Sequence, residues 1–248
     1  MRQRLSKRMF HITMVIVIII AVSFIALMMA LKYDTSGETN MPFSITKISV
    51  ISTVDGQNVD NSSNKWELKV SQNNDIYVYI EKNENYSKTE LIESIKIDNF
   101  QVLNKEVQEN IVFYKPSNNT VSVFENNDEY KISNLEYIGD LASNMQNMKI
   151  SNQGGIVAFR CSNIDIGTYI SNEDDEIQYN KLLSKLEIEN DKLKEVISFD
   201  MVIKLSSNVS FKATNIKLEI PVDDIVNKGT TSTDITDLEN VVFKRLEN

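Results

Sequence analysis

Clustered acidic side chains are the residues of this chain whose types and spacing come nearest to a reactive or ligand-binding site. The clusters are Glu173, Asp174, Asp175 and Glu176; Glu125 with Asp128 and Glu129; and Asp223 with Asp224. Two converging carboxyl groups can cleave a glycosidic bond, and carboxylate oxygens bind Ca²⁺. None of the clusters has the spaced twelve-residue loop of an EF-hand, and 35 acidic residues will place some pairs close together by chance. We therefore expect solvated acidic turns, and we assign no catalytic and no metal-binding residue.

Other kinds of catalytic or cofactor site lack the residues that they need. The chain has one cysteine, Cys161, and one histidine, His11, which lies beside the apolar N-terminal run. Zinc sites need several such ligands, and a catalytic thiol needs an activating base. Cys161 follows an apolar stretch of alternating faces, so we expect it to be buried and inert. Neither glycine-rich phosphate-binding motif occurs, so Gly154 and Gly155 indicate a turn. The sequence favours a protein that is not an enzyme and has no cofactor.

Two tyrosines offer a different kind of candidate site. Tyr77 and Tyr79 share one face of a predicted strand, where they could form a platform for a sugar or a peptide. If that strand is buried on both faces, they belong to the core instead, and we favour this second interpretation.

The chain is organised around the uncharged run Ile12–Leu31. A helix of that length spans about 30 Å, the thickness of the bilayer hydrocarbon, so the lipid bilayer is its expected partner. Basic residues precede the run, which predicts a cytoplasmic segment 1–11, a tether 32–42 and an extracytoplasmic remainder. A cleaved signal peptide is less favoured, because the run exceeds the usual apolar length and Met28 occupies a small-residue position. A buried core helix is the weakest alternative, because nothing else is apolar enough to surround it.

Charge and cysteine content limit the binding partners and the cellular compartments that we expect for the protein. Its net charge is −9, and the four basic residues before the apolar run leave 22 basic and 35 acidic residues beyond it, a net −13. Such an acidic surface disfavours nucleic acid as a partner. A single cysteine permits no internal disulfide. An exported chain without disulfides, rich in Ile, Asn and Lys, favours a bacterial cell envelope.

From Phe43 onward, apolar residues recur with a period of two, which predicts half-buried antiparallel strands. The alternating runs are Trp66–Val70, Ile76–Ile80, Ile95–Ile97, Val121–Val123, Ile156–Cys161, Ile164–Ile170, Ile197–Leu205 and Ile216–Ile220, with a closing strand at Val241–Phe243. Phe100 and Val102 are out of phase with Ile97, which predicts a bulge. Turns are expected at 73–75, 116–119 and 126–128, where Asn, Asp, Ser and Pro are concentrated.

One segment near 175–188 has helical spacing instead. Tyr179, Leu182, Leu183 and Leu186 form one stripe, with Asn172 or a neighbour as a possible N-cap. We expect this helix to cover one end of a sandwich; a partner-binding helix is the alternative.

These patterns predict an all-β ectodomain behind one N-terminal transmembrane helix. Its two blocks, 43–145 and 146–248, suggest two tandem Ig-like sandwiches, with a single larger sandwich as the alternative. The functional hypothesis is non-enzymatic binding or assembly at the cell envelope, with other envelope proteins or the cell wall as partners. Two alternatives stay open. One is a carboxylate-dependent hydrolase or glycan-binding module acting on the wall, and the other is an accessory subunit that acts through its membrane span.

Overall fold

The computed structural model describes residues 2–60, 65–103, 110–172 and 176–246, and it separates two compact units, Met1–Asn40 and Met41–Asn248. The first unit contains helix α1 (Arg2–Ser36). Among the described residues, it is the one helix long and apolar enough to cross a bilayer, over Met9–Ser36. The helix therefore runs past the predicted span and takes in the first part of the predicted tether. It ends where Gly37 adopts a left-handed φ of 63° and donates its N–H to the Tyr33 carbonyl at 2.8 Å.

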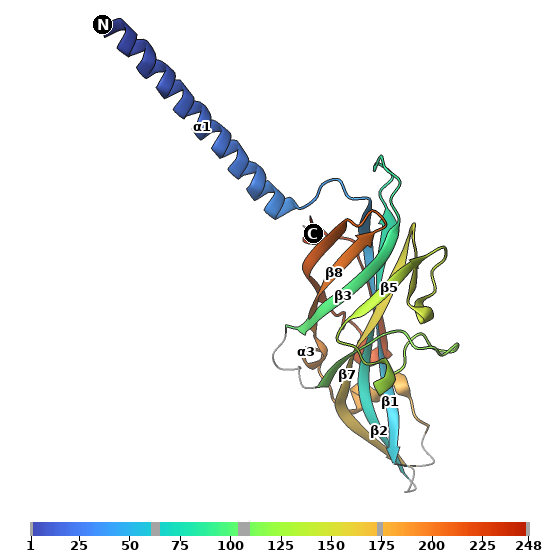
Figure 1. Ribbon diagram of the computed structural model, residues 1–248. Helices are drawn as coiled ribbons and strands as arrows, with labels where there is room; N and C mark the ends of the chain where they lie inside the picture. Colours follow the sequence, from blue (N-terminus) through green and yellow to red (C-terminus); the bar gives the residue numbers. More distant parts are fainter. Residues whose placement is uncertain (1, 61–64, 104–109, 173–175, 247–248) are drawn as a thin grey trace. The chain divides into compact units, whose positions relative to one another are not determined.

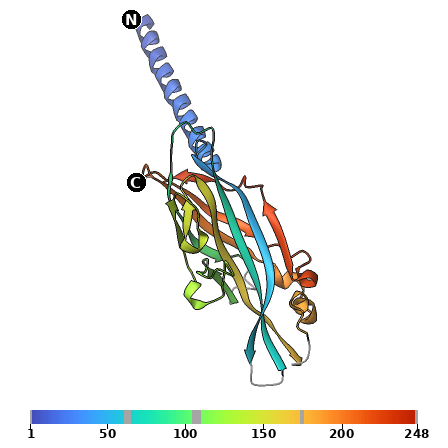
Figure 2. The ribbon, with the colours of Figure 1, turned by 90° about the vertical axis from the view of Figure 1, so that its right-hand side faces the viewer.

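The second unit is a sandwich of two sheets, seen in two views in Figures 1 and 2. Sheet A has the order β10 (Thr230–Ile235), β1 (Phe43–Asp60), β2 (Lys65–Lys82), β7 (Gly154–Asn172) and β4 (Ile111–Tyr114). Sheet B has the order β11 (Phe243–Arg245), β9 (Ser210–Glu219), β8 (Val196–Leu205), β3 (Ile92–Val102), β5 (Leu135–Asp140) and β6 (Lys149–Ser151). Neighbouring strands are antiparallel except for the parallel pair β5 and β6.

The strand order differs from the predicted division into tandem sandwiches at 145/146. Strand β7 from the second half lies between β2 and β4, and β3 from the first half lies between β8 and β5. Strands β2 and β7 pair along nearly their whole length, from Lys65 opposite Asn172 to Glu81 opposite Gly154. Neither half can close its sheets alone, and the alternative of a single larger sandwich describes the structure. The narrower expectation of an Ig-like fold stays a prediction.

The main core lies between the two sheets and follows the predicted period of two. Ile76 and Val78 of sheet A, and Ile95 and Ile203 of sheet B, are fully buried in one apolar cluster. Phe159 of β7 and Phe199 of β8 meet edge to face across the sheets, with ring centroids 5.2 Å apart. Such contacts add to the free energy gained from burying apolar area.

Two local predictions differ from the structure. Residues 73–75 form no turn but lie inside β2, because their side chains have hydrogen-bonding partners within the fold. Val121 and Val123 form no strand but belong to an irregular segment, where Val121 is 91% exposed. The predicted bulge is present, since the register of β3 with β8 shifts between Asp98 and Gln101. At this bulge the Phe100 ring stacks on the Phe113 ring, and their centroids are 4.6 Å apart.

The predicted helix near 175–188 is short and broken. It consists of a turn η4 (Tyr179–Lys181), α2 (Leu182–Lys185) and, after a break, α3 (Asn190–Leu193). Leu182 and Leu183 are buried, whereas Tyr179 is 47% exposed. Helix α2 ends at Lys185 with Leu186 as its C-cap, and the following Glu187 adopts a left-handed φ of 54°. The Asn172 side chain and residues 173–175 lie outside the described part of the chain, and the cap residue of η4, Gln178, makes no side-chain capping bond.

These turns cover an end core that is separate from the main core. The end core consists of Leu68, Val70, Leu182, Leu183, Leu193, Val222 and Ile225, the last from α4 (Ile225–Lys228). It lies where β1, β2 and β7 extend toward the end of the sandwich (Figure 1). Single turns η2 (Asp128–Tyr130) and η3 (Met145–Asn147) complete the described elements. The expectation that helical residues cover one end of a sandwich is therefore met by several short turns.

Tyr137 of β5 links the two sheets through a hydrogen-bonded hydroxyl. The fully buried hydroxyl donates to the Ala158 carbonyl at 2.9 Å and accepts from the Ala158 N–H at 3.1 Å. Tyr137→Phe leaves both backbone groups without these bonds, so we expect the free energy of unfolding to fall by about 1–3 kcal/mol. Urea denaturation of the full chain in detergent measures this change. Tyr169→Phe, which removes one exposed hydrogen bond, is the control with an expected loss below about 0.5 kcal/mol.

Candidate functional site

Strands β4 and β5 are joined by a long connection, residues 115–134, which we call the strap. The strap crosses the outer face of sheet A. Its first residue is tied to its later part, since the Lys115 N–H donates to the Tyr130 carbonyl at 2.9 Å. Its middle is held by Phe124, which is 2% exposed although it lies outside the sandwich. The Phe124 ring packs edge to face on Tyr77 at 6.3 Å and lies 5.1 Å from the Arg160 guanidinium. The strap is therefore fixed on the sheet by a buried aromatic side chain.

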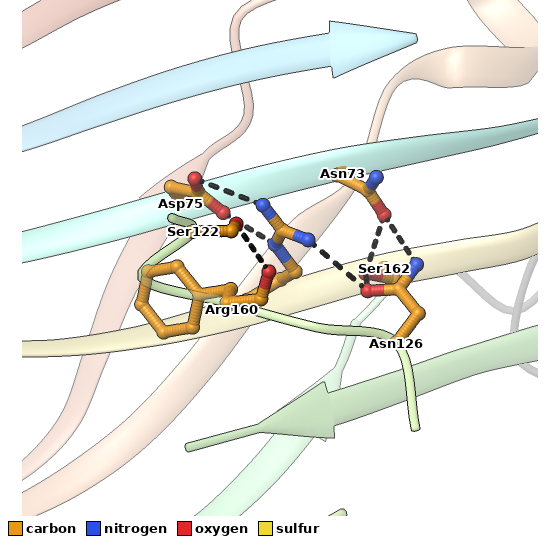
Figure 3. A network of polar contacts seen from close by, with 7 residues as sticks. Asn73, Asp75, Ser122, Asn126, Arg160 and Ser162 are labelled. Carbon is orange, nitrogen blue, oxygen red and sulfur yellow. Dashed lines mark hydrogen bonds and ion pairs between the residues drawn. The ribbon is translucent and has the colours of Figure 1, made fainter. Parts of the chain in front are cut away.

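Polar side chains tie the strap to β2 and β7 (Figure 3). The Arg160 guanidinium donates to both carboxylate oxygens of Asp75, at 2.6 and 3.1 Å, and to Asn126 Oδ1 of the strap at 3.2 Å. Asn126 in turn donates to Asn73 Oδ1 at 2.8 Å, which also accepts from the Ser162 hydroxyl at 2.8 Å. Asp75 and Arg160 are only 16% and 12% exposed, so water screens the pair weakly. The bidentate ion pair neutralises the charge of Arg160.

A hollow of about 530 Å³ opens beside this network, bounded by the strap and the outer face of β1. We call it the outer hollow. Its lining residues are Thr53, Val54, Asp55, Gly56 and Gln57 of β1; Ser71 and Asn73 of β2; Arg160 of β7; and Ser122, Phe124, Glu125 and Asn126 of the strap. Volumes of this size are usual for small-ligand sites, although most such sites are more apolar.

The structure corrects the interpretation of Tyr77 and Tyr79 as core residues. Both lie on the outer face of β2, opposite Ile76 and Val78, and both are half-buried. Phe124 covers Tyr77, and burial together with the nearby Asp75 carboxylate raises the Tyr77 pKa to about 12. The Lys47 ammonium lies 4.3 Å from the Tyr79 ring. Neighbouring side chains thus lie against both rings, and no open aromatic platform results.

The acidic clusters lie in separate places. Glu125 lines the outer hollow, whereas Asp128 pairs with Lys131 at 2.6 Å and Asp224 pairs with Lys228 at 2.6 Å. Glu173, Asp174 and Asp175 lie outside the described residues. Within residues 2–60, 65–103, 110–172 and 176–246, no three His, Cys, Asp or Glu side chains come together in a way that could hold a metal ion.

A layer of buried polar side chains crosses the interior of the sandwich. This polar layer consists of Ser52, Gln72, Asn74, Asn163 and Glu195, each at most 3% exposed. It lies between the two apolar cores. Along each contributing segment, a main-core residue comes on one side of the polar residue in the sequence, and a residue that belongs to the end core or packs against it comes on the other side. On β2 the polar residues lie between Val70 and Ile76, and Glu195 lies between Leu193 and Ile197.

Glu195 is the central member of the polar layer. Its Oε2 accepts from the Asn74 amide at 3.3 Å and contacts the Cys161 thiol at 3.8 Å. Burial raises the Glu195 pKa to about 7, although hydrogen bonds from Asn163 and Cys161 oppose the shift. Within the described part of the chain, the oxygens Ser52 Oγ, Gln72 Oε1 and Glu195 Oε1 are buried without a hydrogen-bond partner. Such groups are costly, so the polar layer reduces the stability of the fold.

Cys161 is fully buried, as the sequence predicts, and burial followed by the adjacent Glu195 raises its pKa well above the ordinary value. A thiol in that state is a poor nucleophile. Glu195 is desolvated as a catalytic acid needs to be, yet it is 1% exposed and does not line the outer hollow. Glu195 is therefore not placed to act as the acid of a hydrolytic site in the outer hollow.

Comparison with known proteins yields no relative that could inform the site. No protein-family model matches the sequence, and no curated protein or solved structure matches it significantly. The arrangement itself, an open polar hollow beside a fixed strap, can bind a ligand through hydrogen bonds.

Proposed function

We propose that this chain is a single-pass membrane protein of a cell envelope, with residues 1–11 in the cytoplasm and the sandwich outside. There the sandwich binds a ligand or a partner and carries out no reaction. The outer hollow is the observation that carries the proposal, because it combines accessible hydrogen-bonding groups with a rigid frame. The apolar helix over Met9–Ser36 and the basic residues before it support the membrane placement.

Membrane orientation is tested with single introduced cysteines and a membrane-impermeant maleimide. Native Cys161 is buried, so it gives little background labelling. We expect Lys82→Cys, on an exposed end of β2, to be labelled in intact cells. Lys7→Cys is expected to react only after permeabilisation. The reverse pattern contradicts the proposed orientation.

The role of the sandwich in recognition is tested by crosslinking in intact cells followed by co-purification. The native chain is compared with a variant in which an unrelated apolar sequence of equal length replaces Ile12–Leu31. The proposal predicts that the crosslinked partner or wall material is retained after the exchange, because the sandwich is unchanged. Loss of the partner on exchange contradicts the proposal and favours an accessory subunit acting through its membrane span.

A further inference from the structure

The accessible lining of the outer hollow is mixed and somewhat more polar than apolar. Phe124, the one aromatic side chain among the described lining residues, is 2% exposed and already packed against Tyr77 and Arg160. Val54 is partly buried against the end core. What faces the open space includes the side chains of Asp55, Gln57, Ser122 and Asn126. A peptide that binds through apolar side chains therefore finds no pocket for them here.

The charges of the outer hollow disfavour an anionic ligand. Among the described residues that line it, Arg160 is the one cation, and its guanidinium is already neutralised by Asp75. Two further carboxylates, Asp55 and Glu125, belong to the lining. A phosphate or a polyanion would meet net negative charge in a chain that is already acidic.

The hydrogen-bonding groups of the outer hollow instead match sugar hydroxyls. Guanidinium has five N–H donors, and three of those on Arg160 are used by Asp75 and Asn126. The Asp55 and Glu125 carboxylates and the Gln57 amide supply acceptors, whereas the amide oxygens of Asn73 and Asn126 already accept hydrogen bonds within the network. A sugar hydroxyl both donates and accepts, so a ring bearing several hydroxyls satisfies such a mixed lining better than a ligand with one kind of group.

We infer that the outer hollow binds a short saccharide that is neutral or carries an amine. This inference rests on the proposed function only for the placement of the hollow outside the cell. Because the described lining residues offer no exposed aromatic ring for stacking, we expect one hollow to bind weakly, with a dissociation constant of about millimolar order. Many copies anchored in one membrane increase the overall affinity for a polymeric glycan.

The test uses ligand-observed NMR on the full chain in detergent micelles. The probes are chitotetraose, its amine-bearing de-N-acetylated form, and the anionic tetragalacturonic acid. We expect binding of at least one of the first two and none of the third. Binding of tetragalacturonic acid alone, or of no probe, overturns the inference.

Matched leucine variants locate the bound saccharide. Gln57→Leu removes a hydrogen-bonding amide from the exposed rim of the outer hollow without adding an aromatic ring, and is expected to weaken binding about tenfold. Gln153→Leu alters another exposed glutamine, in the turn before β7, and should leave binding unchanged. Equal binding by Gln57→Leu and the native chain overturns the assignment.

The maleimide experiment distinguishes this inference from the proposed function. A saccharide bound in the outer hollow of a chain with the reverse orientation contradicts the proposed function alone. The expected orientation without saccharide binding contradicts this inference alone.

Discussion

Glu195→Gln is expected to abolish a pH dependence of stability worth about 3 kcal/mol. The Glu195 pKa is about 7 in the folded chain, against an ordinary value of 4.5, and each unit of difference corresponds to about 1.4 kcal/mol. Between these values the folded state holds a proton that the unfolded state has released. The free energy of unfolding therefore falls as pH rises from about 4.5 to about 7, and stays reduced above that range.

The measurement is urea denaturation of the native chain and the variant in detergent at several pH values between 4.5 and 8. The glutamine side chain of the variant cannot ionise, so the difference between the two proteins should change with pH even if glutamine alters packing at every pH. Glu219→Gln, at an exposed position on β9, serves as the control and should retain the native profile. A constant difference between the native chain and Glu195→Gln would mean that Glu195 titrates normally.

The second large effect is expected from Asp75→Asn, which removes the charge facing Arg160. The guanidinium is 12% exposed and loses its carboxylate partner, while its bond to Asn126 cannot replace that charge. Removing one partner of a buried ion pair costs about 3–5 kcal/mol, and this partly exposed pair should cost about 2–4 kcal/mol. Loss of the carboxylate should also loosen the strap, because Arg160 holds both Asn126 and the Phe124 ring.

A double variant separates charge from packing in the Asp75 experiment. Adding Arg160→Gln to Asp75→Asn removes the stranded cation, so the double variant should be more stable than Asp75→Asn alone. Asp224→Asn breaks an exposed ion pair with Lys228 and should cost below about 1 kcal/mol. Equal costs for Asp75→Asn and Asp224→Asn would show that Arg160 and Asp75 contribute no more than a surface pair.

The long strands were predictable from the alternation of residues such as Ile76, Val78 and Ile80. The pairing partners were not, because several strands that are far apart in the sequence lie side by side in the sheets: β3 neighbours β8, and β2 neighbours β7. A pattern of period two tells which face is buried but not which strand lies alongside. The division into two sandwiches failed for that reason.

The alternation of residues along β2 indicates the polar layer, but the turn-forming residue types at 73–75 favoured a different interpretation. Every even-numbered residue from Leu68 to Ile80 points into the sandwich, including Gln72 and Asn74. Residues 73–75 carry turn-forming side chains, but the phase of the apolar residues is the same before and after them, and a turn would have broken that phase. No local sequence pattern indicates the outer hollow, because its residues come from four separate segments: β1, β2, β7 and the strap.

The polar layer also has a consequence for how the sandwich unfolds. Strands β1, β2 and β7 pass through the polar layer with their backbone pairing largely continuous, whereas the apolar packing is divided in two. Cooperativity between the two ends is therefore transmitted mainly by the backbone ladder. The end core is small and covered by single helical turns, so it forms a local unit that can exchange its amide protons while the main core remains folded.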